Sequence, residues 1–579
     1  MSVPLNWSLP LKQWNIAPRV PPEHLAQFPD CAPTLIQLLY NRGVSEPAHV
    51  DAFLSDDGSL KSDPRLLRDV DVAVARVVDA IARGESIAVY GDFDVDGITG
   101  AVLLHEVLES LGGRVVPYIP HRVEEGYGLN CNALSTLRQQ GVSLVISVDC
   151  GVGAAREISF GKEIGLDVIV VDHHQVPQVS TKAVAVVDPR REDCSYPFKD
   201  LAAVGVAFRL AQVLLRSCWL PGDPRIRDIE ERLLDLVALG TVADVVPLMG
   251  ENRQLVRQGL VALNRTRRLG LRAMIEMAGL RPGCIGTGAI GYILGPRLNA
   301  AGRLYDAVAS YRLLTTRMNN EAYELAQYLE KTNQERQQLT DEAVRRAREV
   351  IIGKDEMPKL LVVSGPEYRA GIVGLVAGRL VEEFYRPAVV IEFGQQESRG
   401  SARSIAELNI THLLHKCGDL LTRFGGHARA AGFALPTANL PQFETRLQEI
   451  AEGELAGVEL HPRLPVDCEL RPRQISWDTY HLVEVMAPFG FGNPVPTFLT
   501  RNLWVADARR VGKDSPHLKL RLTDGRGWYG AIGFHLGQLA DFVSRKRIDV
   551  VYTLESNEWN GNVALQMNVK DFRIATDDS

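Results

Sequence analysis

The sequence predicts an α/β protein of several domains: a doubly wound, mostly parallel sheet, a long connecting helix, a second α/β lobe and a C-terminal β-barrel. From Ser86 onward, short apolar runs rich in β-branched residues alternate with helical stretches, which is the pattern of a parallel sheet. A polar segment from Asn319 to Val350 contains neither Gly nor Pro, so it is expected to form one long helix. Beyond residue 460, strand-like runs separated by turn residues predict the barrel.

The elements of the first sheet follow one another in order. The predicted strands are 86–90, 114–120, 143–149, 167–172 and 183–188, and the helices between them are 98–113, 132–141 and 153–164. Residues 200–260 have a helical pattern. A second α/β unit begins with the strand 360–365 and ends near residue 455. The expected domains are an N-terminal lead-in (1–75), a first α/β domain (76–315), the connecting helix (316–355), a second lobe (356–457) and the barrel (458–579).

The composition is that of a folded protein without a membrane anchor. Of the 579 residues, 46% are hydrophobic and 23% are charged, which excludes long disorder. No run reaches the ~18 consecutive apolar residues that a membrane helix needs, and the N-terminus lacks the pattern of a signal peptide. We therefore expect a cytoplasmic location and no membrane contact. The 8 cysteines form no CxxC pair, so free thiols are expected rather than a zinc ribbon.

The charge balance leaves nucleic-acid binding open. The net charge is −7, but phosphate binding depends on local basic surfaces and not on the sum. Two stretches are locally basic, although a solvated charged face explains either of them equally well. Their basic residues are Arg265, Arg267, Arg268 and Arg272 in the first, and Arg501, Arg509, Arg510, Lys513, His517, Lys519 and Arg521 in the second.

Acidic and imidazole side chains follow three of the predicted strands. The first strand leads into Asp92, Asp94 and Asp96, the third into Asp149, and the fourth into Asp172, His173 and His174. The carboxyl ends of parallel strands meet at the edge of the sheet where ligands bind. Acids gathered at one edge repel one another unless cations neutralise them, and mixed carboxylate and imidazole ligands suit Mn²⁺ or Mg²⁺. The pattern therefore predicts a metal centre.

Three other readings of these acids were weighed. The string from Asp92 to Gly97 begins like a calcium loop, but such a loop needs Glu at its twelfth position, where Leu103 stands. A dinucleotide site needs glycines after the first strand, and acids stand there instead. A turn-capping role explains any single aspartate, but it does not explain all of the clusters together.

The motifs resemble a known superfamily. The strings are VYGDFDVDGITG (89–100), ISVDCG (146–151), VDHH (171–174) and ALGTVADVVPL (238–248), and they resemble the four motifs of the DHH phosphoesterases in order. The resemblance implies two ions, Mn²⁺ or Mg²⁺, held by Asp92, Asp94, Asp96, Asp149, His173 and Asp244. Asp149 would bridge the ions, Asp172 would orient a histidine, and His174 would face the substrate phosphate.

Further strings resemble the RecJ family within this superfamily, over residues 60–575. They include IPHRVEEGYGL (119–129), GPRLNAAGRL (295–304), TNQERQ (332–337), GSARSI (400–405), RFGGHARAAGF (423–433) and PFGFGNPVPTF (488–498). The resemblance implies a DHH domain, a DHHA1 lobe and an oligonucleotide-binding (OB) barrel. One departure is Arg369, which stands where the family has a histidine, and a second is Ala402, where Gly is common.

The family resemblance implies a 5′→3′ exonuclease that hydrolyses single-stranded DNA to 5′-mononucleotides in recombination and repair. The candidates for reading the 5′ end are Arg122, Arg297, Arg303, Ser401, Arg403, Gly425, Gly426 and His427, because arginine matches phosphate bidentately and glycine lets the backbone approach a ligand closely. An ordinary salt bridge or turn is the alternative for each. Base stacking in the barrel would use Trp504, Trp528, Tyr529 or Phe534, for which core packing is the alternative.

By resemblance alone, the partners besides single-stranded DNA are a single-strand-binding protein and a RecQ-type helicase. Three other functions remain open. A phosphodiesterase of short oligonucleotides or cyclic dinucleotides would typically lack the barrel of residues 460–579, and a pyrophosphatase would not need it. A non-catalytic scaffold would have lost metal ligands that this sequence retains.

Overall fold

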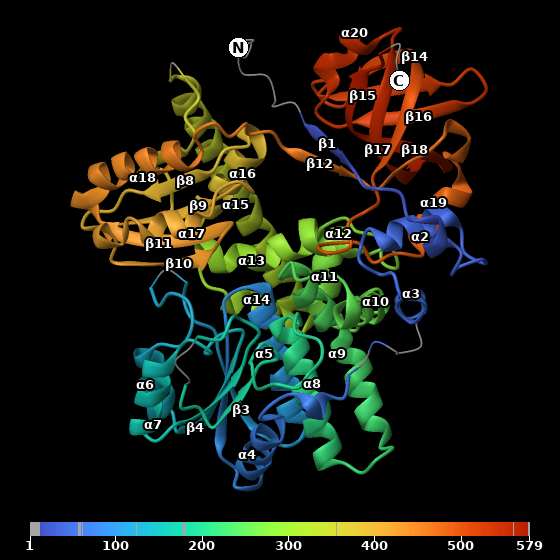
Figure 1. The fold of residues 1–579 in the computed structure, drawn as a ribbon. Coiled ribbons are helices and arrows are strands. Elements are labelled where there is room, and N and C mark those ends of the chain that lie inside the picture. Colours follow the sequence, from blue (N-terminus) through green and yellow to red (C-terminus); the bar gives the residue numbers. More distant parts are fainter. Residues whose placement is uncertain are drawn as a thin grey trace. The chain divides into compact units, whose positions relative to one another are not determined.

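The computed structural model describes residues 12–55, 60, 62–122, 124–177, 181–354, 356–559 and 561–576 (Figure 1). The chain forms two compact units, and each is described by itself. The first contains Ser62–Val246 and Gln258–Pro462. The second contains Lys12–Lys61, Pro247–Arg257 and Arg463–Ser579.

The first unit begins with the predicted doubly wound sheet. Its strands are β2 (Ser86–Gly91), β3 (Arg114–Tyr118), β4 (Val142–Val148), β5 (Asp167–Val171) and β6 (Ala185–Val187), in the spatial order β3-β2-β4-β5-β6. Every pair is parallel, which confirms the prediction. One face packs against α6 (Cys131–Gln139) and α7 (Ala155–Glu163). The other face packs against α4 (Val70–Ala82), α5 (Val95–Ser110) and α8 (Ala203–Cys218) (Figure 1).

The register of this sheet aligns the residues that follow its strands. Each strand ends opposite the last residue of its neighbour: Gly91 opposite Val148, Val148 opposite Val171, and Val171 opposite Val187. The next backbone N–H then continues the ladder. Asp92 donates to Val148 (3.2 Å), Asp149 to Val171 (3.0 Å) and Asp172 to Val187 (3.1 Å). These backbone bonds hold the three aspartates at one edge of the sheet.

Helices connect this sheet to the second lobe of the first unit. They are α9 (Pro224–Ala243), α11 (Leu269–Met277), α12 (Thr287–Ala289), a π-helix (Ile290–Leu294), α13 (Gly295–Leu304) and α14 (Val308–Thr315). The predicted long helix is α15 (Asn319–Ile352). Its buried stripe, which includes Ala326, Leu329 and Ala347, packs against the neighbouring helices, while most of its charged residues are exposed.

The second lobe contains a mixed sheet in the order β10-β11-β9-β8-β7. The strands are β7 (Leu361–Gly365), β8 (Ala388–Glu392), β9 (Glu397–Arg403), β10 (Arg423–His427) and β11 (Ala430–Pro436). Only β7 and β8 are parallel. The helices are α16 (Val373–Phe384), α17 (Ile410–His415) and α18 (Leu440–Glu454). Leu413, Phe433 and Phe443 lie in the core between this sheet and its helices.

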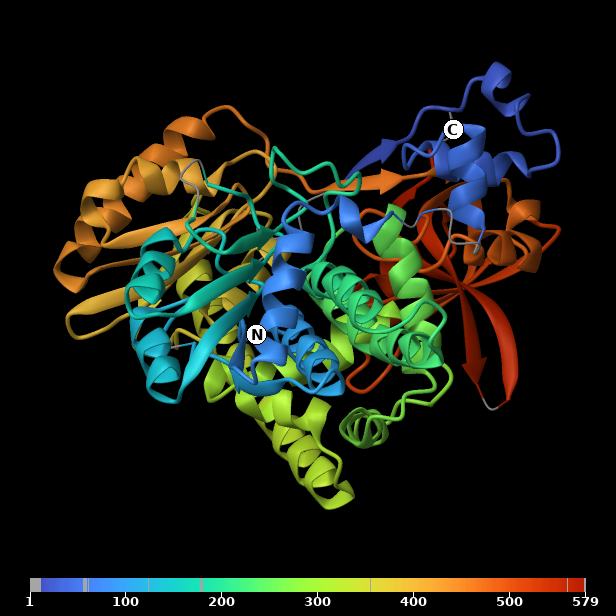
Figure 2. The same ribbon diagram turned by 90° about the horizontal axis from the view of Figure 1, so that it is seen from below.

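The second unit contains the predicted barrel. Its strands are β14 (Phe498–Val511), β15 (His517–Thr523), β16 (Trp528–Gly533), β17 (Arg547–Trp559) and β18 (Asn562–Ile574). They follow the order β14-β15-β16-β18-β17, and pairing of β14 with β17 closes the barrel. A short strand, β13 (Cys468–Glu469), joins β14. The unit also contains α10 residues up to Arg257, α19 (Trp477–Glu484) and α20 (Ala540–Val543). Figure 2 shows the long hairpin of β17 and β18.

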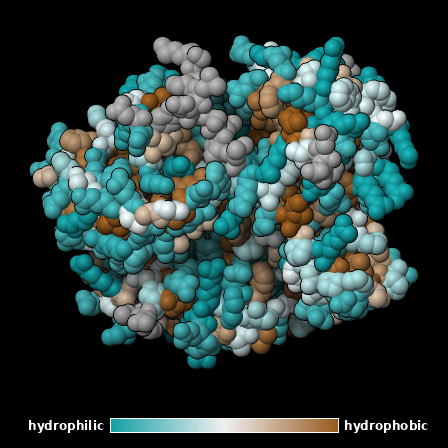
Figure 3. Space-filling view, turned by 45° about the horizontal axis from the view of Figure 1, so that its top comes forward, coloured by the Kyte–Doolittle hydropathy of each residue, from teal (hydrophilic) through white to brown (hydrophobic). Residues whose placement is uncertain are grey.

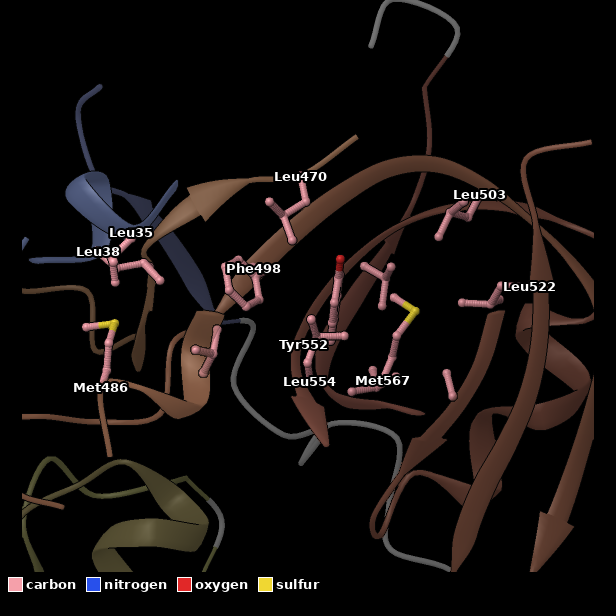
Figure 4. Packing of buried hydrophobic residues seen from close by; sticks show 14 of the residues in the cluster. Leu35, Leu38, Leu470, Met486, Phe498, Leu503, Leu522, Tyr552, Leu554 and Met567 are labelled. Atoms are coloured by element: carbon pink, nitrogen blue, oxygen red, sulfur yellow. The ribbon is translucent and has the colours of Figure 1, made fainter. Parts of the chain in front are cut away.

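The N-terminal residues belong to the barrel unit rather than to a separate lead-in. Strand β1 (Gln13–Ile16) pairs with β12 (Arg463–Val466). Helix α2 (Pro33–Tyr40) contributes Leu35 and Leu38 to a core that also holds Phe498 (Figure 4). Short helices α1 (Pro22–Leu25) and α3 (Pro47–Leu54) flank α2. The amphipathic α2 has no core of its own, so it is stable only where its apolar face is covered.

In the described ranges, no helix combines the length and the apolar character that a membrane crossing requires. Hydrophilic side chains predominate on the face shown in Figure 3, and hydrophobic ones form small separate patches there.

Candidate metal centre and anion pocket

The turn from β2 into α5 places three carboxylates by local hydrogen bonding. Asp94 caps α5, because its Oδ1 accepts hydrogen bonds from the backbone N–H groups of Asp96 (2.9 Å) and Gly97 (3.1 Å). Asp96 is 1% exposed and lies at the N-terminus of α8. Its two oxygens accept from the backbone N–H groups of Ala203 (2.7 Å) and Val204 (2.8 Å). A helix N-terminus therefore fixes the orientation of this carboxylate.

Two glycines allow the close packing around Asp96. A Cβ at Gly97 would lie 2.5 Å from the backbone N of Asp92, so the first turn of α5 can contact the strand end only with glycine there. A Cβ at Gly240 of α9 would lie 2.9 Å from Oδ1 of Asp96. Helix α9 therefore approaches the site closely and delivers Asp244, the residue that follows its last turn.

His173 lies among the carboxylates from the other strands. Its Nε2 is 3.3 Å from Oδ1 of Asp149, 3.6 Å from Oδ2 of Asp244 and 4.0 Å from Oδ2 of Asp96. Asp149 adopts a left-handed backbone conformation (φ 64°), which costs energy for a residue other than glycine and is found where function requires it. Ligand atoms of one ion bound at roughly 2.1 Å are about 3 Å apart, so these spacings suit a shared cation.

The potential ligands form three overlapping groups in the described residues. They are Asp92, Asp94 and Asp149; Asp149, His173 and His174; and Asp96, His173 and Asp244. In each group the ligand atoms lie within 4.8 Å of one another. Oδ1 of Asp92, Oδ1 of Asp149 and Nε2 of His173 are buried without a hydrogen-bond partner. Unpartnered buried polar atoms are costly, so this donor set fits divalent cations that take oxygen and imidazole ligands.

The electrostatics of the cluster favour cations as well. Burial and the neighbouring carboxylates raise the pKa of Asp96 to about 7 and the pKa of Asp244 to about 9. The same causes raise the pKa values of Asp92 and Asp149 well above the usual range. Burial, together with the nearby His174, lowers the pKa of His173 to about 4, so its imidazole is neutral and able to bind a metal. Bound cations would reverse the carboxylate shifts.

Asp172 and His174 form a pair beside the cluster. Nδ1 of His174 lies 2.8 Å from Oδ1 of Asp172, whose other oxygen accepts from the N–H of Val152 (3.0 Å). Although burial raises it, the pKa of Asp172 is lowered overall by the hydrogen bond to His174. The pKa of His174, which burial alone would lower, is raised by Asp172. The hydroxyl of Tyr127 donates to the backbone oxygen of Asp149 (3.0 Å) and lies 3.3 Å from Nδ1 of His174.

A pocket of about 600 Å³ lies next to this cluster in the first unit. Arg122 joins the two, because its guanidinium lies 4.7 Å from the ring centre of Phe93, the residue between Asp92 and Asp94. Five of the residues predicted to read the 5′ end line the pocket: Arg122, Arg303, Ser401, Arg403 and Gly425.

The arginines of this pocket are not neutralised by acids. Among the described residues, Arg122, Arg303 and Arg403 form no ion pair with a carboxylate, and Arg403 donates to Ser401 Oγ (2.9 Å). Burial and the nearby Arg122 and Arg336 lower the pKa of Arg303 to about 9. Burial likewise lowers the pKa values of Arg122 and Arg403. Clustered guanidiniums without counter-charges are the signature of an anion site.

The structure places the other predicted residues outside this lining. Arg297 forms an ion pair with Glu330 (2.5 Å) and donates to the backbone oxygen of Ile293, which is the salt-bridge alternative. Gly426 and His427 continue β10 beyond Gly425, and His427 is exposed. Arg369 is also exposed. The sequence analysis did not single out Phe93, Tyr127, Arg399, Arg423 or Gly432, all of which line the pocket.

Comparisons with known proteins agree with this arrangement. The DHH family N-terminal domain matches residues 86–241, the DHHA1 domain matches residues 358–453, and the RecJ OB domain matches residues 466–571. The three domains thus cover the first sheet, the second lobe and the barrel.

Individual proteins match over most of the chain. The single-stranded-DNA-specific exonuclease RecJ of Bacillus subtilis is 36% identical over 94% of this chain and 68% of its own length. The crystal structure of RecJ in complex with Mn²⁺ from Thermus thermophilus is 29% identical and superposes with a TM-score of 0.83, over 97% of this chain and 80% of that one. The corresponding Mg²⁺ complex is 28% identical, with a TM-score of 0.77 over 97% and 79%. The chain belongs to the RecJ family.

Proposed function

We propose that this chain is a metal-dependent exonuclease that hydrolyses single-stranded DNA from its 5′ end to 5′-mononucleotides, in DNA recombination and repair. One observation carries the proposal: a pocket of unneutralised arginines adjoins the carboxylate and histidine cluster, and Phe93 and Arg122 link the two. A phosphate-binding pocket beside a hydrolytic centre selects a strand end, because an internal segment has no terminal phosphate to place there.

The cluster would hold two Mn²⁺ or Mg²⁺ ions. The ligands are Asp92, Asp94, Asp96, Asp149, His173 and Asp244. Asp149 belongs to two of the three ligand groups, which supports its assignment as the bridging carboxylate. When bound, the ions lower the pKa of a water and neutralise charge on the phosphate.

The catalytic groups of the chain position and stabilise the scissile phosphate. Asp172 holds His174 through Nδ1, which leaves Nε2 of His174 for the substrate. The raised pKa of His174 favours the protonated imidazole, which donates to a phosphate oxygen as negative charge builds up there. Two supports hold the polypeptide of the site in place: the N-terminus of α8, which orients Asp96, and Tyr127, which holds the backbone of Asp149.

The pocket residues would read the 5′ phosphate. Arg122, Arg303 and Arg403 supply charge, Ser401 supplies a hydroxyl, and Gly425 leaves the floor open. For Gly426 and His427 we propose contact with the neighbouring strand backbone, because they continue the same β-strand. For Arg297 we propose that it braces α13 against α15 through Glu330.

The barrel would add affinity for longer strands. On one stretch of its surface, Trp528 is 59% exposed and the guanidinium of Arg521 lies 4.2 Å from its ring centre. Trp504 and Trp528 both pair with Thr523 of the strand between them, and Trp504 is 38% exposed. An aromatic ring with an adjacent cation suits a base and its phosphate. Phe534 is also exposed, whereas Tyr529 is half-buried.

The cellular setting follows from this activity. We assign single-stranded DNA as the substrate, a single-strand-binding protein and a RecQ-type helicase as partners that supply it, and the cytoplasm as the location. The proposed domains are 76–315 for catalysis, 316–355 for the connecting helix, 356–457 for end recognition and 458–579 for strand binding. To the last of these we add residues 12–54, because they share its core.

The experiment uses single-stranded DNA with a 5′ phosphate and a label at its 3′ end. We expect shortening with Mn²⁺ or Mg²⁺, none with chelator, none on blunt duplex and none with Asp149→Ala. Cleavage of dinucleotides or cyclic dinucleotides alone, with intact long strands, would replace this proposal by the small-substrate phosphodiesterase.

A further inference from the structure

The arginine pocket continues along one face of the second-lobe sheet. Arg399, Ser401 and Arg403 alternate along β9, so their side chains share a face. The register adds neighbours to each row: Gly432 and Gly425 beside Ser401, and Ala434 and Arg423 beside Arg399. The face therefore has Arg403 at one end, glycines in the middle, and Arg399 with Arg423 at the other end.

The middle of this face is an open floor. A Cβ added at Gly425 or at Gly432 would meet no atom within 4 Å, and neither glycine has a positive φ. Neither backbone conformation nor protein packing therefore requires glycine at these two positions. Adjacent glycines on paired strands are explained instead by a ligand that approaches the backbone.

The pocket is larger and more positive than one terminal phosphate needs. Arg399 and Arg403 are four residues apart, which is about 13 Å along an extended strand. A volume of about 600 Å³ is in the range of sites that hold a whole small-molecule ligand. A phosphomonoester carries about −1.5 to −2 charges, whereas the deep arginines Arg122, Arg303 and Arg403 supply three positive charges without a paired carboxylate.

The far arginines are only weakly satisfied within the protein. Nε of Arg399 lies 3.4 Å from Oε2 of Glu397, and Nη2 of Arg423 lies 3.8 Å from the same oxygen. The side chain of Arg423 is 63% exposed. One carboxylate therefore serves two guanidiniums, and the pair retains positive charge toward the glycine floor.

We propose that this extension is a polyphosphate subsite, so that the enzyme accepts strands whose 5′ end carries a diphosphate or triphosphate. The proposal rests on the proposed function of the pocket: the α-phosphate occupies the Arg122, Arg303 and Arg403 end. The β- and γ-phosphates then extend over Gly425 and Gly432 toward Arg399 and Arg423. Such ends arise where a polymerase starts a chain on a nucleoside triphosphate, and this class of reaction would supply the substrate.

The first cleavage of such a strand differs from the later ones only in its product. Water attacks the phosphorus of the first internucleotide link, its oxygen joins the new 5′ phosphate of the shortened strand, and the bond to the 3′ oxygen breaks. That oxygen takes a proton and becomes the 3′ hydroxyl of the released nucleotide. The triphosphate stays intact, so the first product is a nucleoside 5′-triphosphate and all later products are monophosphates.

The test compares strands of one sequence with a 5′ hydroxyl, monophosphate or triphosphate, labelled at the 3′ end. We expect the triphosphate strand to be degraded at least as fast as the monophosphate strand, with one nucleoside triphosphate released per strand. Arg423→Ala should slow degradation of the triphosphate strand roughly tenfold, since a charge-assisted contact is lost, and leave the monophosphate strand unchanged. Arg348→Ala, which removes an exposed arginine paired with Glu383 outside the pocket, should change neither.

The outcomes separate the two proposals. Degradation of the monophosphate strand with an inert triphosphate strand, or equal effects of Arg423→Ala on both, would overturn the subsite and leave the proposed function intact. Degradation of neither strand would overturn the proposed function itself. In a second arm, inorganic tripolyphosphate at constant free Mn²⁺ competes with the monophosphate strand. Competition that Arg423→Ala weakens supports the subsite and shows that free polyphosphates also reach it, whereas competition unchanged by the variant counts against it.

Discussion

Nδ1 of His174 lies 2.8 Å from Oδ1 of Asp172, and a second carboxylate oxygen of Asp172 accepts a hydrogen bond from the backbone of Val152. A carboxylate can only accept, so the proton of this contact resides on Nδ1 and the opposite nitrogen of the ring faces outward. One buried aspartate thereby sets both the orientation and the charge of the histidine beside the ligand cluster.

Asp172→Asn should therefore lower kcat by about tenfold to a hundredfold, the usual effect of removing a group that orients a catalytic or metal-binding residue. Because Asp172 raises the pKa of His174, the loss of activity on the alkaline side should also shift to lower pH. The measurement is the dependence of kcat on pH for both proteins. A fall in kcat without any change in the pH profile would assign Asp172 a structural role only.

Removal of metal should make stability depend on pH in a defined direction. Burial and like charges raise the pKa values of Asp96 to about 7 and of Asp244 to about 9. The folded protein then binds more protons than the unfolded chain, so its free energy of unfolding decreases as pH rises from roughly 4 to 9. Since the ions bind ionised carboxylates, the increase of Tm on adding Mn²⁺ should be larger at about pH 8 than at about pH 6.

Thermal unfolding with chelator and with Mn²⁺ at both pH values provides the measurement. Asp244→Asn should reduce both the pH dependence and the increase of Tm. Asp228→Asn, at an exposed position outside the cluster, is the control and should change neither. A Tm increase independent of pH would contradict the proposed ligand set.

Arg403→Ala should weaken recognition of a 5′ phosphate specifically. Loss of a charge-assisted contact corresponds to about tenfold to a hundredfold in kcat/KM, and a 5′-hydroxyl strand should be affected much less. Arg297→Ala is the matched control: its partner is Glu330, so we expect a lower Tm with an unchanged preference for phosphate. Equal losses on both strand ends for Arg403→Ala would remove it from end recognition.

Trp528→Ala should reduce affinity for long strands more than for short ones. Stacking of one base is worth about 1–3 kcal/mol, so the Kd for long strands should rise roughly fivefold or more, while cleavage of the shortest substrates stays the same. A series of strand lengths at fixed salt provides the measurement. Trp477→Ala, at an exposed tryptophan of α19, serves as the control, and equal effects of the two variants would count against stacking on Trp528.

The sequence predicted most of the fold and the strand-end acids because both depend on local patterns. Alternating runs identify the strands of the first sheet, and Asp92, Asp149 and Asp172 follow those strands directly. The capping role of Asp94 was also within reach, since an aspartate before a helical run is a known start signal. The contact of Asp96 with Val204 was not, because it joins segments 108 residues apart.

The remainder depends on tertiary packing. Arg122, Arg303 and Arg403 become one pocket only when three distant segments fold together, so only the family resemblance connected them beforehand. Arg423 and Gly432 gave no local signal, because their role follows from the register of β9, β10 and β11. The association of α2 with the barrel could not be predicted either, since an amphipathic helix does not indicate which core will cover it.

The most direct measurement of the central claim is degradation of 5′-phosphorylated single strands blocked at one end by bound streptavidin. The account predicts that a block at the 5′ end stops hydrolysis, because the terminal phosphate cannot reach Arg122 and Arg403. A block at the 3′ end should allow hydrolysis to proceed up to the block, with release of 5′-mononucleotides that requires Mn²⁺ or Mg²⁺. Hydrolysis stopped by the 3′ block and unaffected by the 5′ block would contradict it.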